Sequence, residues 1–327
     1  MDPLSQACLG SSLAQATENN RTKQLSALII GALSGMAPDL DFLIRSSSDP
    51  LLFLEYHRQF THSLIFIPIG ALFCTVLLYF LFKKQLTFKQ VYIFSFLGYA
   101  THGLLDACTS YGTQLFWPFS NERVSWSIVS IIDPVFTIPI LLLIMFSVYK
   151  KNNHYARIAF TYAILFLSVG FFQKIRALDS IVQIAKQRGH LPERIIVKPS
   201  FANRHVWKLI YEYNNNYYVD AVKLLWNKHL IPGTSVQKLD VLRDFPSLNK
   251  QSIQAKDIER FRWFSNDFLA VNPFDKSIII DVRYSFIPNK IKMMWGIKID
   301  NSMNHVLFKT KSRPNKKTRQ EFIDMLF

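Results

Sequence analysis

Histidine and aspartate residues recur in this chain at spacings that suit a metal site. His102 and Asp106 are four positions apart, so they share one face of a helix and can bind the same cation. Zinc accepts both ligand types, and its catalytic sites keep one position open for water. A Pro-Asp-Leu-Asp motif and a His-Arg-Gln-Phe-Thr-His motif supply further ligands. We therefore predict a site for one or two divalent metal ions, most simply zinc, with six candidate ligands: Asp39, Asp41, His57, His62, His102 and Asp106.

Two more acidic residues are candidates for proton transfer. Asp133 and Glu55 lie near the same predicted membrane surface, and we predict that one of them acts as general base. Each feature also has a structural explanation when it is taken alone. A His–Asp pair on a helix can be a packing hydrogen bond, Asp39 can cap a helix, and Asp133 can compensate for a proline kink. The shared location of these residues at one membrane face favours the metal interpretation.

Five apolar runs have the length needed to cross a hydrocarbon layer of roughly 30 Å. They lie at about 25–44, 63–82, 91–108, 128–149 and 158–173. Residues 4–17 are weakly apolar and too short to span, which predicts a short helix that packs on the bilayer or dips into it. Ala27, Gly31 and Gly35 share one helix face and allow a close helix contact. The composition, 50% hydrophobic with 28 Phe, agrees with a membrane domain over residues 1–174.

Lys and Arg are concentrated at those ends of the apolar runs that lie on one side of the membrane. The opposite ends carry only Arg45, Arg58 and Arg123. Because positive charge favours the cytoplasmic side, the ends near 45–62, 106–127 and 174, where the candidate ligands lie, should face outward. The C-terminal part should then be periplasmic. The cytoplasmic ends carry Arg21, Lys23, Lys83, Lys84, Lys89, Lys150, Lys151 and Arg157.

Residues 175–327 have the character of a basic soluble domain. Residues 1–173 hold 11 Lys and Arg against 9 Asp and Glu, and the rest of the chain holds 27 against 14. Strands are predicted at 204–213, 216–226, 277–286, 293–299 and 304–309, with a hairpin turn at 214–216. Helices are predicted at 178–188, 254–265 and 317–326. The expected fold is an α-helical polytopic membrane domain, with about five spans and a short N-terminal helix, followed by a small α+β domain.

Other function classes lack a supporting pattern. The cysteines Cys8, Cys74 and Cys108 are too widely spaced for a disulfide framework or a zinc finger. No Gly-x-Ser-x-Gly, P-loop or His-Glu-x-x-His motif occurs. The net charge of +15 is explained by anionic lipid head groups, so we expect membrane lipids and no nucleic acid as partners. The inward halves of the spans are almost wholly apolar, which argues against metal transport.

Several short motifs occur together in the N-terminal half, namely Met1–Leu4, Ala37–Asp41, His57–Ser63, Thr101–Asp106 and Asp133-Pro134. Together they resemble the YdjM-type family of inner-membrane proteins, whose members are described as metal-dependent hydrolases. The resemblance implies a membrane location and a metal site. The family opens with a Thr-His pair where this chain has Ser5-Gln6. Gln6 therefore either replaces a histidine ligand as a weaker oxygen donor, or the site has one ligand fewer.

Two main hypotheses follow from these features. The first is a metal-dependent hydrolase at the outer face of the bacterial inner membrane, acting on an ester or phosphodiester of a lipid or lipid-linked molecule, because the site lies at head-group depth. The second is a non-enzymatic membrane scaffold or envelope-stress partner with a structural polar network or metal site. An open coordination position reached by a groove would favour the first hypothesis, and a saturated four-ligand site would favour the second.

Overall fold

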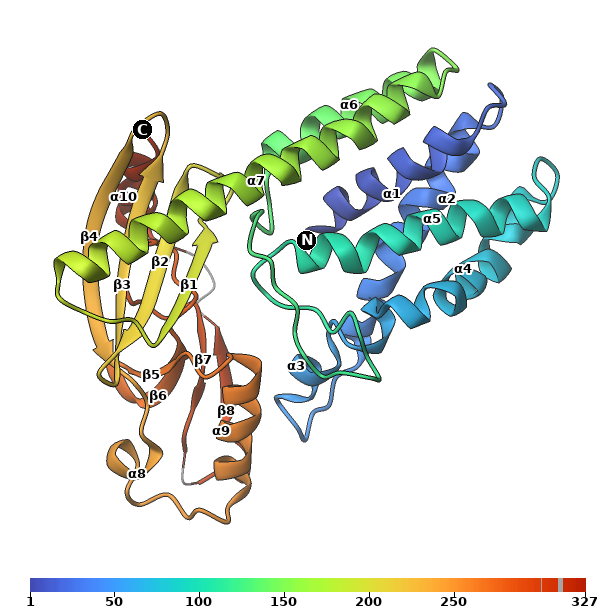
Figure 1. Cartoon of the computed structure of the whole chain (residues 1–327). Coiled ribbons are helices and arrows are strands. Elements are labelled where there is room, and N and C mark those ends of the chain that lie inside the picture. The colour runs from blue at the N-terminus through green and yellow to red at the C-terminus, as the bar shows by residue number, and fades with distance from the viewer. Residues whose placement is uncertain (301, 311–313) are drawn as a thin grey trace. The chain divides into compact units, whose positions relative to one another are not determined.

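The chain divides into two compact units, shown in Figure 1. The computed structural model describes residues 1–300, 302–310 and 314–327. The first unit contains Met1–Ile44, Tyr56–Phe172 and Phe201–Asn203, and the second contains Arg45–Glu55, Gln173–Ser200 and Arg204–Phe327. Residues 45–55 therefore belong with the C-terminal part, although two apolar runs flank them in the sequence. The domain boundary at residues 174 and 175 stays a prediction about which parts fold independently.

Helices make up the first unit. They are α1 (Pro3–Thr17), α2 (Gln24–Met36), η1 (Ala37–Leu43), η2 (Phe60–His62), η3 (Leu64–Phe66), α4 (Ile67–Phe82), α5 (Phe88–Ala107), α6 (Pro134–Tyr149) and the first half of α7 (His154–Gln187). The η elements are short 3₁₀ helices. Thr87 begins α5 with a capping box, in which its hydroxyl accepts from Gln90 N and the Gln90 side chain accepts from Thr87 N.

Three helical stretches among the described residues are long and apolar enough to cross a membrane: Gln24–Leu43, Leu64–Phe82 and His154–Gln187. The prediction of an apolar helical region followed by an α+β region is confirmed. The count of five spans goes beyond this finding. α6 has only 16 residues, and α5 carries Lys89, His102 and Asp106 among its apolar residues.

The predicted short N-terminal helix is present as α1. It packs against α2, α5 and α6 within the first unit. Its polar residues find partners there: Gln15 Nε2 donates to Gln24 O at 3.2 Å and to Ile144 O at 3.4 Å. The low apolar content of α1 therefore reflects protein neighbours on most sides, not exposure to water.

Small residues let the central helices approach closely, as the spacing in α2 predicted. A Cβ atom placed on Gly98 of α5 would lie 2.5 Å from Gly31 O and 3.0 Å from Gly31 Cα. Such distances are too short for any side chain, so the α2–α5 contact requires glycine at position 98. This contact joins the two helices that carry Asp39 and His102, because η1 continues directly from α2.

Two antiparallel sheets and several helical segments form the described part of the second unit. The first sheet has the order β1 (Arg194–Pro199), β2 (Val206–Tyr213), β3 (Asn216–Leu224) and β4 (Lys228–Gln237). The second has the order β5 (Leu269–Asn272), β6 (Asp275–Asp281), β7 (Trp295–Lys298) and β8 (Leu307–Thr310). The helices are the second half of α7, α8 (Val241–Asp244), α9 (Ile253–Phe264) and α10 (Lys316–Leu326), and most of α3 (Leu52–Tyr56) also lies here.

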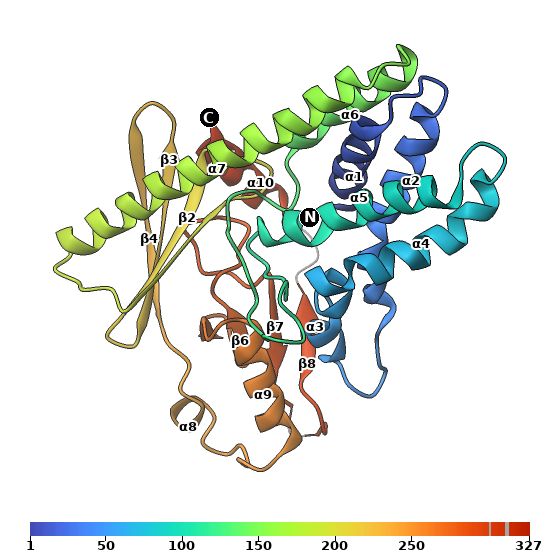
Figure 2. The same ribbon diagram turned by 45° about the vertical axis from the view of Figure 1, so that its right-hand side comes forward.

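The core of the second unit has two layers of apolar contacts. Ala177 and Ile181 of α7 pack with Trp207 on one face of the first sheet, as Figure 2 shows for the helix and strands. Ile210 and Val219 belong to a separate cluster with residues of the second sheet. The first sheet is therefore buried on both faces, which explains why β2 is almost continuously apolar or aromatic.

The predicted hairpin is present, and three strands were missed. Asn214 and Asn215 both have positive φ, 48° and 56°, as a two-residue type I′ turn requires. β2 and β3 pair across this turn. β1, β4 and β5 were not predicted. β4 is an exposed edge strand that contains Pro232 and Gly233, which are unusual in strand interiors.

Lys208 is a buried cation in β2. Its Nζ donates to Ser285 Oγ at 2.9 Å and to the carbonyl oxygens of Pro288 and Lys290 at 3.1 and 3.3 Å. Burial lowers the pKa of Lys208 from 10.5 to about 7, although the charge of Asp281 opposes that shift. The unfolded chain therefore binds one more proton than the folded chain between these two pH values.

Stability should consequently rise with pH over this interval. In the wild type, the free energy of unfolding should increase by about 2 kcal/mol more between pH 7 and pH 9 than in Lys208→Met, since one proton contributes about 1.4 kcal/mol per pH unit. Urea unfolding of the full chain at both pH values measures the difference. The control is Lys256→Met, at an exposed position on α9, which should keep the wild-type slope. Equal slopes in all three proteins would show that Lys208 keeps an ordinary pKa.

Candidate metal centre

Three separate segments of the first unit bring four candidate ligands together. Asp39 lies on η1, where Pro38 begins a tighter turn directly after α2. His62 ends the 3₁₀ helix η2, and His102 and Asp106 lie one turn apart on α5. One donor atom from each of the four lies within 4.8 Å of the others. Both histidines and Asp106 are buried, and the Asp39 side chain keeps 24% of its surface exposed.

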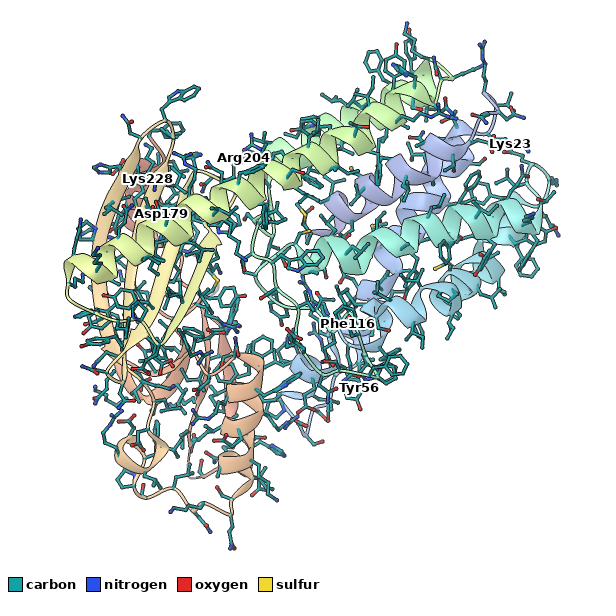
Figure 3. The ribbon with its side chains drawn as sticks, viewed as in Figure 1. Lys23, Tyr56, Phe116, Asp179, Arg204 and Lys228 are labelled. Carbon is teal, nitrogen blue, oxygen red and sulfur yellow. The ribbon has the colours of Figure 1, made fainter. Side chains whose placement is uncertain are left out.

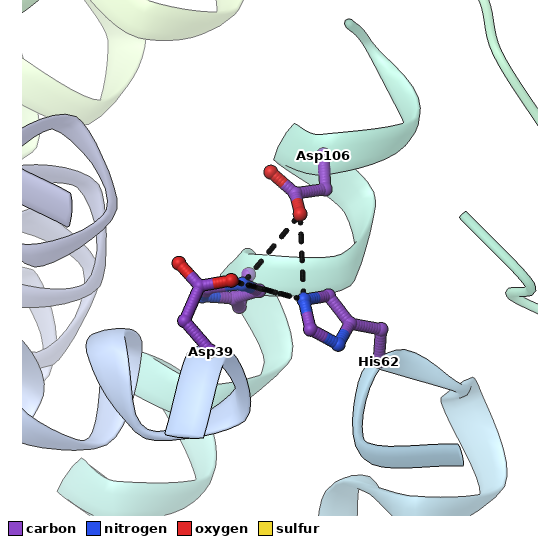
Figure 4. Close-up of side chains that lie close together, drawn as sticks. Asp39, His62 and Asp106 are labelled. Atoms are coloured by element: carbon purple, nitrogen blue, oxygen red, sulfur yellow. Dashed lines mark hydrogen bonds and ion pairs between the residues drawn. The ribbon is translucent and has the colours of Figure 1, made fainter. Parts of the chain in front are cut away.

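The donor atoms have nearly equal separations. His62 Nε2 and His102 Nε2 are 3.0 Å apart, and each is 3.4 Å from Asp39 Oδ1. Asp106 Oδ2 lies 3.4 Å from His62 Nε2 and 3.7 Å from His102 Nε2. Figure 4 shows the side chains of Asp39, His62 and Asp106 pointing toward one another.

These separations fit a tetrahedral zinc ion. Ligand atoms placed about 2.0–2.1 Å from a tetrahedral zinc are about 3.3 Å from one another. Five of the six distances between the four donor atoms run from 3.0 to 3.7 Å, and the sixth, between Asp39 and Asp106, is no more than 4.8 Å. The set of two imidazoles and two carboxylates is also one that zinc accepts. The cluster could therefore hold a metal ion.

In both histidines, contacts at Nδ1 orient the ring so that Nε2 faces the cluster. His102 Nδ1 donates to Gly35 O at 2.5 Å, so Nε2 of the neutral ring carries the lone pair. His62 Nδ1 lies 3.2 Å from Asp41 Oδ2 and 3.0 Å from Thr61 Oγ1. Metal-binding histidines in proteins have carbonyl or carboxylate partners of this kind. Both rings are thus oriented to present Nε2 to a cation.

A positive charge is needed among these atoms, because four electron-pair donors repel one another at such distances. Burial lowers the pKa of His62, but hydrogen bonds with Asp106, Asp39 and Asp41 outweigh burial and raise the pKa to about 10. A proton on His62 can therefore supply that charge. Metal binding must displace this proton, so metal affinity should increase with pH.

Asp106 has three further contacts, with Arg58, Gln6 and Met1. Arg58 Nε forms an ion pair with Asp106 Oδ2 at 2.9 Å, and Gln6 Nε2 donates to Asp106 Oδ1 at 2.9 Å. The amino group of Met1 also contacts Oδ1. Gln6 is fully buried, and its Oε1 has no hydrogen-bond partner within the described part of the chain. Gln6 therefore adjoins the cluster with an oxygen that could face a cation.

Asp41 and His57 form a second group that shares Asp39. Single donor atoms of Asp39, Asp41 and His57 lie within 4.8 Å of one another. Asp41 is already engaged: it lies 2.7 Å from His57 Nδ1 and accepts from Arg58 N at 3.0 Å and Thr61 Oγ1 at 2.9 Å. This bonding suits Asp41 to orienting two histidines. Its assignment as a metal ligand, like that of His57, stays a prediction.

Each of the two predicted general bases has a structural partner. Asp133 Oδ1 accepts from Val135 N and Phe136 N at 3.1 and 3.3 Å and caps α6. Glu55 belongs to the second unit, where its Oε1 accepts from Arg260 Nε at 2.5 Å. Both carboxylates have these structural partners, and their catalytic role stays a prediction.

Several residues that support the cluster were not predicted from the sequence. Arg58 was counted only as a surface charge, although it lies inside the His57–His62 motif and pairs with Asp106. Its backbone has a positive φ of 66°, which is uncommon outside glycine. Thr61 and the carbonyl of Gly35 were also missed. The one sequence signal for Arg58 and Thr61 is that they lie next to the candidate histidines in the chain.

The apolar helices and the buried His–Asp cluster define a helical membrane protein with a potential metal site. The chain belongs to the YdjM inner membrane protein family, whose family model matches residues 1–177. This match confirms the resemblance found in the motifs, and it indicates an inner-membrane location.

Two curated relatives match part of the chain. The uncharacterized protein YfhP of Bacillus subtilis (strain 168) is 27% identical over 206 residues, which are 59% of this chain and 58% of YfhP. The inner membrane protein YbcI of Escherichia coli (strain K12) is 30% identical over 108 residues, which are 32% of this chain and 61% of YbcI. The chain thus spans less than two thirds of either relative. No solved structure matches the chain.

Proposed function

We propose that this protein is a multi-pass, metal-dependent hydrolase of the bacterial inner membrane. It would hold zinc at Asp39, His62, His102 and Asp106 and cleave an ester or phosphodiester of a lipid or lipid-linked molecule. The observation that carries the proposal is the convergence of these four donor atoms, with both histidines oriented by other groups. Because four protein donors fill a tetrahedral shell, hydrolysis further requires that the partly exposed Asp39 yield its position to water or that the ion accept water as a fifth ligand. A zinc ion held there would supply Lewis-acid chemistry, acidifying water and polarising a carbonyl or phosphoryl oxygen.

His57 is a better candidate for the general base than Asp133 or Glu55. Its Nδ1 lies 2.7 Å from Asp41 Oδ1, so Nε2 of the neutral ring is the proton acceptor. The side chain is 24% exposed and belongs to the group that includes Asp39. We propose that His57 takes up the proton which the attacking water loses, with Asp41 orienting the ring. Asp133 and Glu55 are less suited, because each is engaged in a structural interaction.

The arrangement of charges within the first unit supports an outward-facing site. Figures 1 and 2 show the turns α1–α2, α4–α5 and α6–α7 at one end of the helices. Lys23 lies at that end in Figure 3, and Phe116 lies at the opposite end. If the lysine-rich end is cytoplasmic, then η1, η2 and the cluster face the periplasm. We propose that α5 and α6 complete a set of five spans and that the second unit is periplasmic.

Activity measurements with His57→Gln test the proposal. The purified full chain, stripped with chelator and reloaded with zinc, should cleave a fluorogenic ester or phosphodiester lipid in detergent micelles. His57→Gln should lower the rate by a factor of about 10²–10⁴ without changing metal content, since general-base catalysis contributes that much. His154→Gln, at an exposed histidine beginning α7, should change neither quantity. A zinc-loaded protein that cleaves neither substrate class, or a His57→Gln variant with the wild-type rate, would contradict the proposal.

A structural metal site is the second candidate function. Four protein donors would complete a tetrahedral zinc shell, as structural sites do, and would leave no position for water. In that case the protein would be a membrane scaffold. It would bind zinc tightly and unfold more readily after chelation, yet it would show no hydrolysis of either substrate class.

A further inference from the structure

An apolar groove opens beside the cluster within the first unit. It has a volume of about 640 Å³ and lies between α2–η1 and α4. Its walls include Leu33 and Leu40 on one side and Ile69, Phe73 and Leu77 on the other. These five side chains are 42–62% exposed, so they cover the walls of an open groove and not a filled core.

A tyrosine lies at the base of the groove, and a glycine makes room for it. A Cβ atom on Gly70 would lie 2.3 Å from the Tyr99 ring. Tyr99 is 4% exposed and donates from its hydroxyl to Thr61 O at 2.9 Å, so its polar atom is satisfied by protein. The phenol therefore contributes an apolar ring surface to the groove, and it also ties α5 to the segment that carries His62.

Polar groups line only one end of the groove, the end that adjoins the metal cluster. Asp41 and Thr61 are among the lining residues, and Thr61 Oγ1 donates to Asp41 Oδ2 at 2.9 Å. The same Asp41 oxygen lies 3.2 Å from His62 Nδ1. A molecule with an apolar tail in the groove would therefore place its polar end next to the candidate ligands.

The walls of the groove are candidate membrane spans, Gln24–Leu43 and Leu64–Phe82. In a bilayer such a groove is surrounded by hydrocarbon, which makes a lipid chain its natural occupant. The lining residues of α4 run from Ile69 to Leu78, a distance of about 14 Å at 1.5 Å per residue. One leaflet contributes about half of a hydrocarbon core of roughly 30 Å. The groove is thus about as long as one leaflet is thick.

We infer that the groove holds one acyl chain of a membrane glycerophospholipid, with the lipid's ester or phosphodiester at the cluster. The inference deepens the proposed function and rests on it for the claim that the lipid is the substrate. Lipid occupancy itself depends only on the groove. The walls would select lipids with an extended chain in the outer leaflet, whereas the cluster would act on the head of the same molecule.

Photolabelling tests the occupant directly. The full chain is reconstituted into phosphatidylglycerol vesicles that contain a phosphatidylglycerol with a diazirine in one acyl chain, and adducts are mapped by mass spectrometry. In the wild type, adducts should concentrate in residues 33–44 and 66–78, at least fivefold above α6. Ile69→Trp and Leu40→Trp, which fill the groove from opposite walls, should each lower these adducts at least fivefold. Leu72→Trp is the matched control, since Leu72 is 47% exposed on α4 but does not line the groove, and it should lower them less than twofold.

The outcomes separate this inference from the proposed function. Even labelling of all apolar helices, equal effects of Ile69→Trp and Leu72→Trp, or a cross-link between two copies of the chain would each overturn the acyl-chain assignment. Preferential labelling by a diazirine polyprenyl phosphate over the phospholipid would overturn it as well. Metal content is measured on the same samples. Metal binding without groove labelling would refute only the inference. Groove labelling without metal binding would refute the metal-dependent function and the claim that the lipid is its substrate, and it would leave lipid occupancy of the groove standing.

Discussion

Replacing His102 by alanine should abolish stoichiometric metal binding. The wild-type chain should retain about one zinc ion through purification, whereas His102→Ala should retain less than about 0.1. The physical reason is that His102 supplies one of four donors, and its orientation is fixed by the hydrogen bond with Gly35 O at 2.5 Å. Structural zinc binds with about 10–16 kcal/mol, so the loss of one donor of four costs roughly 3 kcal/mol, a factor of more than 100 in affinity.

Elemental analysis of the two proteins measures this effect. His154→Ala is the matched control, because His154 is exposed and begins α7 away from the cluster residues in sequence. It should keep the wild-type metal content. Membrane insertion should be the same for all three proteins, since His102 is not among the apolar residues that drive insertion. If His102→Ala keeps its zinc, then the cluster is not the metal site and the polar network is structural.

The second large effect is expected at Arg260 in the second unit. Its guanidinium binds Asp49 with two hydrogen bonds, of 3.0 and 2.8 Å, and also binds Glu55 and Asp257. Arg260→Met would leave three carboxylates without their shared cation. Because breaking a buried pair costs about 3–5 kcal/mol and these groups are partly exposed, we expect the free energy of unfolding to fall by about 2 kcal/mol.

Urea unfolding and limited proteolysis measure this change. Release of residues 45–55 should increase the rate of tryptic cleavage after Arg45. Arg243→Met, which removes an exposed pair with the adjacent Asp244, should change stability by less than about 0.5 kcal/mol. An Arg260→Met protein as stable as the wild type, with unchanged cleavage at Arg45, would show that the ion pairs do not hold this segment.

The ion pairs of Arg260 also predict that the stability of the second unit depends on pH in the acidic range. Burial raises the pKa of Asp49, but hydrogen bonds from Arg260 and Leu51 N outweigh burial and hold it below the ordinary 3.8. A carboxyl group with a lowered pKa stabilises the folded state above its unfolded pKa, and this contribution is lost as the pH falls. The stability difference between wild type and Arg260→Met should therefore shrink below about pH 4.

Much of the fold could be inferred from local patterns. Apolar length indicated the membrane helices, and consecutive asparagines indicated the β2–β3 hairpin, because both signals depend on neighbouring residues alone. Strands with weak local signals were missed, and β4 is the clearest case. Its Pro232 and Gly233 are tolerated at the edge of a sheet, and edge position is a property of the assembled sheet.

Ligand types and the spacing of His102 and Asp106 follow from the sequence, because helical periodicity places these two on one face. Which other residues join them depends on the packing of α2 against α5 and of η2 beside both. His102 meets Gly35, 67 positions away, and His62, 40 positions away, only once Gly31 and Gly98 allow the helices to approach. Tertiary contacts likewise pair Glu55 with Arg260 and place Asp41 beside both His57 and His62. Local spacing could not reveal these pairings, because they arise from contacts between segments that are distant in the chain.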